Sequence, residues 1–226
     1  MRVIAGAAKG RPLSGPPSTR TRPTTDKVKG ALFSMVETLI VAERPGGSRT
    51  ARPIQIGEPD VWDGLNVLDL YAGTGALGIE ALSRGAAWCD FVESDPKVRL
   101  VIARNLKATD LDRRAATIGT NAVTFVRHRK TPDLHVPYSV VLIDPPYADS
   151  SVESVMASVA TGGLLVSGAL VALEHSRRID VATNYPAAPG NCETSGLTEV
   201  RRRRHGDTEV SIYRWQGPRD QETRSD

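Results

Sequence analysis

Residues 66–85, NVLDLYAGTGALGIEALSRG, contain the pattern that decides the fold. The stretch begins with an apolar run, NVLDLYA, which is typical of a buried strand. A glycine-rich loop, GTGALG, follows, and the residues after it have the apolar spacing of a helix that ends at Gly85. A strand that passes through such a loop into a helix is the opening unit of a parallel α/β sheet.

The same alternation continues along the chain. We expect strands within 88–94, 115–119, 138–144 and 170–175, separated by helices within 96–109, 120–128 and 151–163. Strands that alternate with helices predict a mostly parallel sheet covered on both faces. Residues 195–215, SGLTEVRRRRHGDTEVSIYRW, instead predict an antiparallel hairpin around a His-Gly-Asp turn. The expected fold is therefore α/β, with a mostly parallel seven-stranded sheet that ends in this hairpin.

The chain before residue 66 is organised differently. Residues 2–5 and 11–14 predict a small N-terminal hairpin, and apolar residues recur at helical spacing over 25–42. We expect a basic extension over 1–24 and a main domain over 25–216 that carries a surface loop near 44–62. The polar tail over 217–226 is expected to be disordered.

Positive charge is concentrated at two places in the sequence. The net charge is only +3, but residues 1–30 contain seven basic residues and one acidic residue. A second basic cluster comprises Arg201, Arg202, Arg203 and Arg204. Localised positive charge is typical of a surface that binds a polyanion such as nucleic acid, and a solvated basic arm is the alternative.

Composition excludes several other classes of protein. The apolar share of 40% is enough for a core, and the two cysteines have no metal-like spacing. They indicate a reducing compartment, and the four histidines show no mutual motif, so no metal site is expected. The chain contains no signal-peptide pattern and no apolar run of about 20 residues, which a membrane span needs. We therefore expect a cytoplasmic protein.

The glycine loop suits either of two cofactors. Gly73, Gly75 and Gly78 match G-x-G-x-x-G, and Glu93 ends the next strand, as in dinucleotide-binding sites. Asp69, four residues before Gly73, argues against a pyrophosphate, because each such charge pair costs on the order of 3 kcal/mol at an effective dielectric near 20. The ammonium and sulfonium of S-adenosylmethionine would instead be attracted. The loop favours S-adenosylmethionine, while a dinucleotide and a purely structural turn stay open.

The strand over 138–144 ends in Asp144, Pro145, Pro146 and Tyr147. The prolines stiffen the turn and leave carbonyl acceptors without N–H donors. Acceptors beside an aromatic ring suit a planar group that bears an NH2, such as the exocyclic amine of a nucleobase or a side-chain amide. Stacking of a base on Tyr147 would contribute roughly 1–3 kcal/mol. The alternative is a stiff loop with a solvated acid and a packed ring.

These motifs together resemble Rossmann-like, amino-methylating methyltransferases, and in particular the RsmD family of 16S rRNA guanine-N2 methyltransferases. The resemblance rests on MRVIAGAAKGR, TRPTTDKVKGALFS, LDLYAGTGALGIEALSRGA, FVESD and IDPPY, in that order, and covers most of residues 1–215. It implies a Rossmann-like methyltransferase fold with S-adenosylmethionine as methyl donor. The implied cofactor-binding residues are Asp69, Tyr71, Gly73, Thr74, Gly75, Glu93, Ser94, Asn121 and Ala122. Asn121 stands where many such enzymes have Asp, so its contact with adenine competes with a role as helix N-cap.

The resemblance also implies a substrate. It points to the 2-amino group of one guanine in the 16S rRNA of an assembling or assembled small ribosomal subunit. The catalytic residues would be Asp144, Pro145, Pro146 and Tyr147, and a monomer is expected. The implied RNA-binding residues are Arg2, Lys9, Arg11, Arg20, Arg22, Pro23 and Thr24. Three alternatives remain: an amino-methyltransferase of adenine or cytosine in DNA or other RNA, a non-catalytic RNA-binding assembly factor, and a dinucleotide-dependent oxidoreductase.

Overall fold

The computed structural model describes residues 1–15, 25–42, 61–128, 137–146, 149–161, 163–187 and 195–217. Several predicted features lie outside the described residues. They are Arg20, Arg22, Pro23, Thr24 and Tyr147, nearly all of the expected loop over 44–62, and the tail after residue 217.

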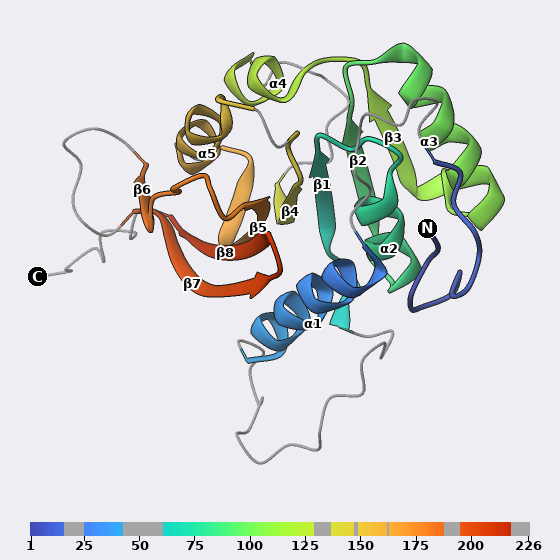
Figure 1. Ribbon diagram of the computed structural model, residues 1–226, viewed down its shortest axis with the longest axis horizontal. Coiled ribbons are helices and arrows are strands. Elements are labelled where there is room, and N and C mark those ends of the chain that lie inside the picture. Colours follow the sequence, from blue (N-terminus) through green and yellow to red (C-terminus); the bar gives the residue numbers. More distant parts are fainter. Residues whose placement is uncertain are drawn as a thin grey trace, which may run out of the picture.

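One mixed sheet organises the molecule (Figure 1). Its order is β3-β2-β1-β4-β5-β8-β7-β6; neighbours from β3 to β5 are parallel, and those from β5 to β6 are antiparallel. The mostly parallel α/β fold with a C-terminal antiparallel hairpin is thus confirmed. The strands are β1 (Asn66–Leu70), β2 (Trp88–Val92), β3 (Ala115–Ile118), β4 (Tyr138–Ile143), β5 (Leu165–Ser176), β6 (Asn184–Pro186), β7 (Gly196–His205) and β8 (Thr208–Gln216).

The expected number of strands was one too low. The sheet has eight strands because β6 pairs with the first residues of β7. This strand has three residues, and only Tyr185 in its centre is buried. So short a segment, ending in Pro186, has too little alternation for a strand prediction.

Helices cover both faces of the sheet, as the alternation predicts (Figure 1). One core contains apolar side chains of α1 (Asp26–Ala42), α2 (Ala76–Ser83) and α3 (Pro96–Thr109), and the other contains those of α4 (Ala122–His128) and α5 (Val152–Ala160). A short 3-10 helix, η2 (Asp112–Arg114), leads into β3. Among the helices within the described ranges, none has both the length and the apolar character that crossing a membrane requires.

The N-terminal segment, residues 1–15, packs against the main body. Its predicted hairpin is reduced to one antiparallel bridge between Arg2 and Pro12. The segment buries Val3, Ala8 and Leu13 in the same core as α2. The described part of the expected basic extension is therefore packed on the main body rather than separate from it.

A cluster of buried charges fixes this segment to α1 and α2. The carboxylate of Glu80 accepts hydrogen bonds from the backbone N–H groups of Ile4 and Ala5, at 2.8 and 2.9 Å. It also lies 3.1 Å from Lys29 Nζ and accepts a hydrogen bond from Arg84 Nε at 2.9 Å. Arg84 Nη1 in turn donates to Glu37. Because each of these side chains has a partner of opposite charge, their ion pairs offset part of the cost of burying them.

Candidate active site at the strand ends

Three acidic residues lie at the carboxyl ends of three adjacent strands. The sheet places β1 between β2 and β4, so Asp69 near the end of β1 lies between Glu93 and Asp144, which directly follow the other two strands. Open α/β sheets bind ligands at this edge. The topology thus brings the predicted cofactor-binding acids and the predicted catalytic Asp144 to the same edge of the sheet.

The glycine loop has the backbone that its sequence predicts. Gly73 and Gly75 have φ of 54° and 79°, and a Cβ added at Gly73 would have no atom closer than Tyr71 O at 3.8 Å. A ligand can therefore approach the backbone at Gly73. Gly78 serves packing instead, because a Cβ there would lie 2.4 Å from the ring of Phe91 on β2.

Asp69 is almost fully buried, with 1% of its surface exposed. Its carboxylate accepts a hydrogen bond from the backbone N–H of Gly78 at 2.8 Å. Burial, together with the negative charges of Asp144 and Glu93, raises the pKa of Asp69 to about 8. A cation that enters this site would favour the ionised carboxylate, whereas an anion would not.

Glu93 joins the glycine loop to the loop after β2. Its Oε2 accepts a hydrogen bond from Gly73 N at 3.0 Å, and its Oε1 accepts one from Asp95 N at 2.8 Å. Ser94 is exposed beside it, and its carbonyl accepts a hydrogen bond from Arg99. A carboxylate offers about four acceptor positions, so Glu93 retains capacity for ribose hydroxyls.

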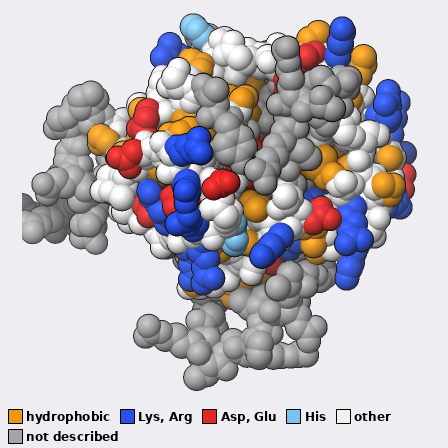
Figure 2. Space-filling model, viewed as in Figure 1, with side chains coloured by type: hydrophobic (Ala, Val, Ile, Leu, Met, Phe, Trp, Pro, Cys, Tyr) orange, Lys and Arg blue, Asp and Glu red, His pale blue; other side chains and the backbone are white. Residues whose placement is uncertain are grey.

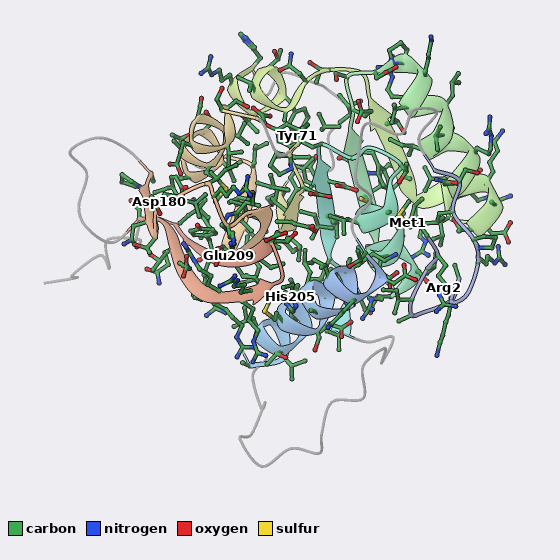
Figure 3. All side chains as sticks on the ribbon, viewed as in Figure 1. Met1, Arg2, Tyr71, Asp180, His205 and Glu209 are labelled. Atoms are coloured by element: carbon green, nitrogen blue, oxygen red, sulfur yellow. The ribbon has the colours of Figure 1, made fainter. Side chains whose placement is uncertain are left out.

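Tyr71 connects the glycine loop with the loop after β4. It is one of two non-glycine residues with positive φ among those described, at 61°, and lies at the end of β1 (Figure 3). Its hydroxyl lies 3.1 Å from Ser151 Oγ, just before α5. Backbone strain of this kind costs of order 1–3 kcal/mol and persists where surrounding contacts hold it.

Asp144 is half-buried at the end of β4, followed by buried Pro145 and exposed Pro146. The Pro146 carbonyl accepts a hydrogen bond from Asp149 N at 2.8 Å, so the turn itself uses one of the predicted proline acceptors. The Asp144 carboxylate and the Pro145 carbonyl are the other two predicted acceptors at this end of β4.

Asn121 caps α4. Its Oδ1 accepts a hydrogen bond from Thr124 N at 2.8 Å, so the N-cap role, one of its two predicted roles, is present. The residue is exposed and Ala122 beside it is buried. An amide oxygen has a second lone pair, so a contact with adenine stays a prediction.

Three of the basic residues predicted to bind RNA, Arg2, Lys9 and Arg11, lie within the described residues, outside this acidic site. Arg2 pairs with Asp26 at 3.3 Å, and Arg11 pairs with Asp110 at 2.6 Å. Lys9 is exposed. Part of the positive charge of the N-terminal segment is thus paired with acidic residues of the same chain.

Asn105 is a residue of the site that the sequence analysis missed. Its Nδ2 donates to Thr74 O in the glycine loop at 2.9 Å, and its Oδ1 accepts from Ser14 N at 2.8 Å. The side chain thereby ties the N-terminal segment and the glycine loop to α3. The sequence does contain a sign of this role, because Asn105 is a polar residue on the otherwise apolar helical face of Val101, Ile102 and Leu106.

A surface groove of about 700 Å³ lies elsewhere, between α4 and α5. Arg127, His128, Ser154 and Ser158 are among its lining residues, and none of the predicted site residues contributes. This groove is therefore distinct from the strand ends where the described site residues lie.

The strand-end residues fit S-adenosylmethionine. The approach at Gly73 is open, Glu93 is positioned for ribose hydroxyls, and the acids suit the ammonium and sulfonium of this cofactor. A pyrophosphate would instead add negative charge beside Asp144 and Glu93 and would further disfavour ionisation of Asp69. Fold and site together define a Rossmann-like methyltransferase.

The comparisons with known proteins narrow this class to a family. The model of the family described as Conserved hypothetical protein 95 matches residues 1–214, and the chain belongs to this family, the RsmD methyltransferases. YlbH of Bacillus subtilis is 31% identical over 96% of this chain and 100% of its own. Ribosomal RNA small subunit methyltransferase D of Escherichia coli is 31% identical over 84% of this chain and 80% of its own. The structure of yhhF from Escherichia coli has a TM-score of 0.69 at 27% identity and covers 96% of this chain and 99% of that one.

Proposed function

We propose that this protein transfers a methyl group from S-adenosylmethionine to the exocyclic 2-amino group of a guanine in 16S rRNA of the small ribosomal subunit, guanine 966 in the family's designation. The observation that carries the proposal is the position of Asp144 and Pro145 beside an acid-lined glycine loop on the adjacent strand. The choice of rRNA is supported by the names of the relatives, which are rRNA methyltransferases.

The cofactor would be held by residues of β1, β2 and their loops. Asp69 and the backbone around Gly73 would bind its methionine part, Glu93 and Ser94 its ribose, and Asn121 with Ala122 its adenine. Tyr71 and Thr74 would shape the loop between these subsites. When bound, S-adenosylmethionine supplies an electrophilic methyl group on a sulfonium.

Asp144 would act mainly by positioning the amine. Two hydrogen bonds, from the amine to the Asp144 carboxylate and to the Pro145 carbonyl, would direct the nitrogen lone pair toward the methyl group. An aromatic amine becomes acidic only as the new bond forms, so Asp144 need not be a strong base. Its charge would stabilise the positive charge that develops on nitrogen. Tyr147, outside the described residues, would stack on the base.

The target base must be accessible, because stacking in a helix hides its amine. We therefore place it in a loop or in a flipped conformation. A monomer working on an assembling or assembled subunit remains our expectation for the active form.

The decisive experiment offers labelled S-adenosylmethionine with unmodified small subunits, naked 16S rRNA and DNA in parallel. We expect label on one guanine of the rRNA, at its 2-amino group, after nuclease digestion and nucleoside analysis. Label on adenine or cytosine would redirect the substrate assignment, and no label on any of them would favour a non-catalytic binding role.

The role of Asp144 is tested separately by Asp144→Ala. We expect methyl transfer to fall by at least about a hundredfold, because oriented hydrogen bonds at the reacting atom are lost. Binding of S-adenosylmethionine, measured by calorimetry, should survive. Full activity in this variant would remove Asp144 from the mechanism. Calorimetry with both cofactors tests the cofactor class, because binding of NADH instead of S-adenosylmethionine would indicate an oxidoreductase.

A further inference from the structure

The second basic cluster of the sequence lies at one end of the β7–β8 hairpin. Figure 2 shows Lys and Arg side chains gathered over this hairpin, and Figure 3 labels His205 and Glu209 there. Arg202, Arg203 and Arg204 are exposed on β7, and Arg177 and Arg178 are exposed where the chain leaves β5. We call these five arginines the hairpin cluster.

The strand directions place this cluster at the edge of the sheet that carries the active site. β5 is parallel to β4, and β8 is antiparallel to β5, so the turn from β7 into β8 lies beside the carboxyl end of β5. Arg177 N donates to Asp207 O at 3.1 Å, which joins that turn to the end of β5 directly. Three strand spacings separate β4 from β7, about 14 Å along the twisted sheet.

The hairpin also extends past the level of Asp144. Ile143, the last residue of β4, pairs with Leu173, which pairs with Ser211 and through it with Arg202. Asp144, one residue further, is therefore level with Arg203, and Arg204 and His205 lie beyond it, an extension of about 7 Å. Arg203, Arg204 and His205 form a basic ridge beside the place where the base would be held.

Acidic neighbours neutralise only part of the cluster. Arg202 pairs with Glu199 at 2.6 Å and lies 3.8 Å from Glu209, and Arg177 lies 3.7 Å from Asp207. Within the described part of the chain, Arg178, Arg203 and Arg204 have no ion pair. These arginines keep their charge available to an anion.

The backbone of β7 contributes as well. β6 pairs only with Gly196–Thr198, so among the described strands the edge of β7 from Val200 to His205 has no further partner. Exposed N–H groups and arginine side chains on one edge are the groups that contact phosphates in nucleic-acid complexes. An alternative is that the arginines only protect this edge against pairing with another chain.

We propose that the end of the β7–β8 hairpin, through Arg203 and Arg204, binds the phosphate backbone of the RNA strand that flanks the target base. This inference rests on the proposed function, since it needs an RNA strand that enters the strand-end site. The principal RNA contact would then lie on the β7–β8 hairpin rather than on the N-terminal segment.

The test compares two double variants that lose the same charge. Arg203→Gln/Arg204→Gln removes the ridge, and Arg104→Gln/Arg113→Gln removes two exposed arginines of α3 and η2, on the opposite side of the sheet. Binding to naked 16S rRNA and to small subunits is measured by filter binding over a series of salt concentrations. Methyl transfer is measured at varied RNA concentration.

We expect the ridge variant to bind about tenfold more weakly, and the slope of log affinity against log salt to decrease by roughly 1.5, since two phosphate contacts are lost. Its KM for RNA should rise while kcat stays unchanged, and the α3 variant should match the wild type. Equal slopes in both variants would overturn the proposal, as would aggregation of the ridge variant without a change in RNA binding. If the wild type methylates no RNA, the proposed function fails, while the salt slopes still decide whether this ridge binds RNA.

Discussion

Two clusters of buried charge contact helix α2, and they are compensated in opposite ways. Glu80, on the helix, is fully buried beside Lys29 and Arg84 and accepts hydrogen bonds from two backbone N–H groups. Asp69, on β1, is also buried. Its carboxylate accepts a hydrogen bond from the backbone N–H of Gly78 on α2, and its charged neighbours are the acids Asp144 and Glu93. In the described residues no cation pairs with Asp69.

The difference distinguishes a structural cluster from the candidate site. A buried carboxylate with two cations holds three elements together and has little to offer a ligand. A buried carboxylate without a cation keeps a raised pKa, which a positively charged ligand can lower. Burial alone therefore does not distinguish the two carboxylates, whereas the presence of cations beside Glu80 does.

Glu80→Ala should break the compensated cluster and give the largest effect. It would leave Lys29 and Arg84 buried without their shared carboxylate, and loss of one partner of such a cluster costs about 3–5 kcal/mol of unfolding free energy. Urea unfolding measures this loss. The matched control is Asp110→Asn, which removes the charge of the exposed pair with Arg11, keeps a residue suited to the φ of 58° at this helix end, and should cost under about 1 kcal/mol. Similar losses in both variants would contradict the structural role of the cluster.

Asp69→Asn should remove a pH dependence from stability. The folded-state pKa of about 8 lies above the ordinary value of 3.8, so the folded protein holds a proton that the unfolded chain has lost. Ionisation of Asp69 therefore does not affect the free energy of unfolding below about pH 4. Between about pH 4 and pH 8 it lowers this free energy progressively as the pH rises. Relative to wild type, the Asn variant should gain a few kcal/mol between those limits.

The same substitution tests the electrostatic role of Asp69 in the site. Asn keeps an acceptor for Gly78 N but has no charge, so affinity for S-adenosylmethionine should fall at least about tenfold. In the wild type, binding should release a proton near neutral pH, which calorimetry in buffers of different ionisation enthalpy detects. Unchanged affinity in the variant would leave Asp69 with a structural role alone.

The parts of the fold that the sequence predicts are those with local causes. Alternating strands and helices, the glycine loop and the stiff turn after Ile143 all follow from spacing and turn chemistry within a few residues. Glu80 contacts Ile4 across 76 positions, and Tyr71 contacts Ser151 across 80, so these bonds depend on packing that no local pattern specifies. The N-terminal charge illustrates the same limit, because a count of basic residues does not say which of them already have partners.

Tyr71→Phe should separate the two halves of the active site at moderate cost. The ring remains, but the bond to Ser151 Oγ is lost, which costs about 0.5–1.5 kcal/mol of unfolding free energy. Burial raises the pKa of Tyr71 to about 12, so the hydroxyl is neutral and the effect should not vary near neutral pH. We expect kcat to fall severalfold with cofactor affinity unchanged. Ser151→Ala should lower kcat to a similar extent, and the double variant should lower it little further than either single variant. Additive losses would show that the bond between Tyr71 and Ser151 does not couple the two loops.

Arg11→Gln should have the smallest effect, and it compares the two basic regions directly. Arg11 already pairs with Asp110 and donates to Ala108 O at the end of α3, whereas Lys9 is exposed nearby. Because a paired charge gains less from a phosphate, Arg11→Gln should change the salt dependence of RNA binding less than Lys9→Gln does, and each less than Arg203→Gln. Filter binding of the three single variants at equal salt gives the order. If Arg11→Gln weakened RNA binding most, the N-terminal segment would be the principal RNA contact and its ion pairs would open on binding.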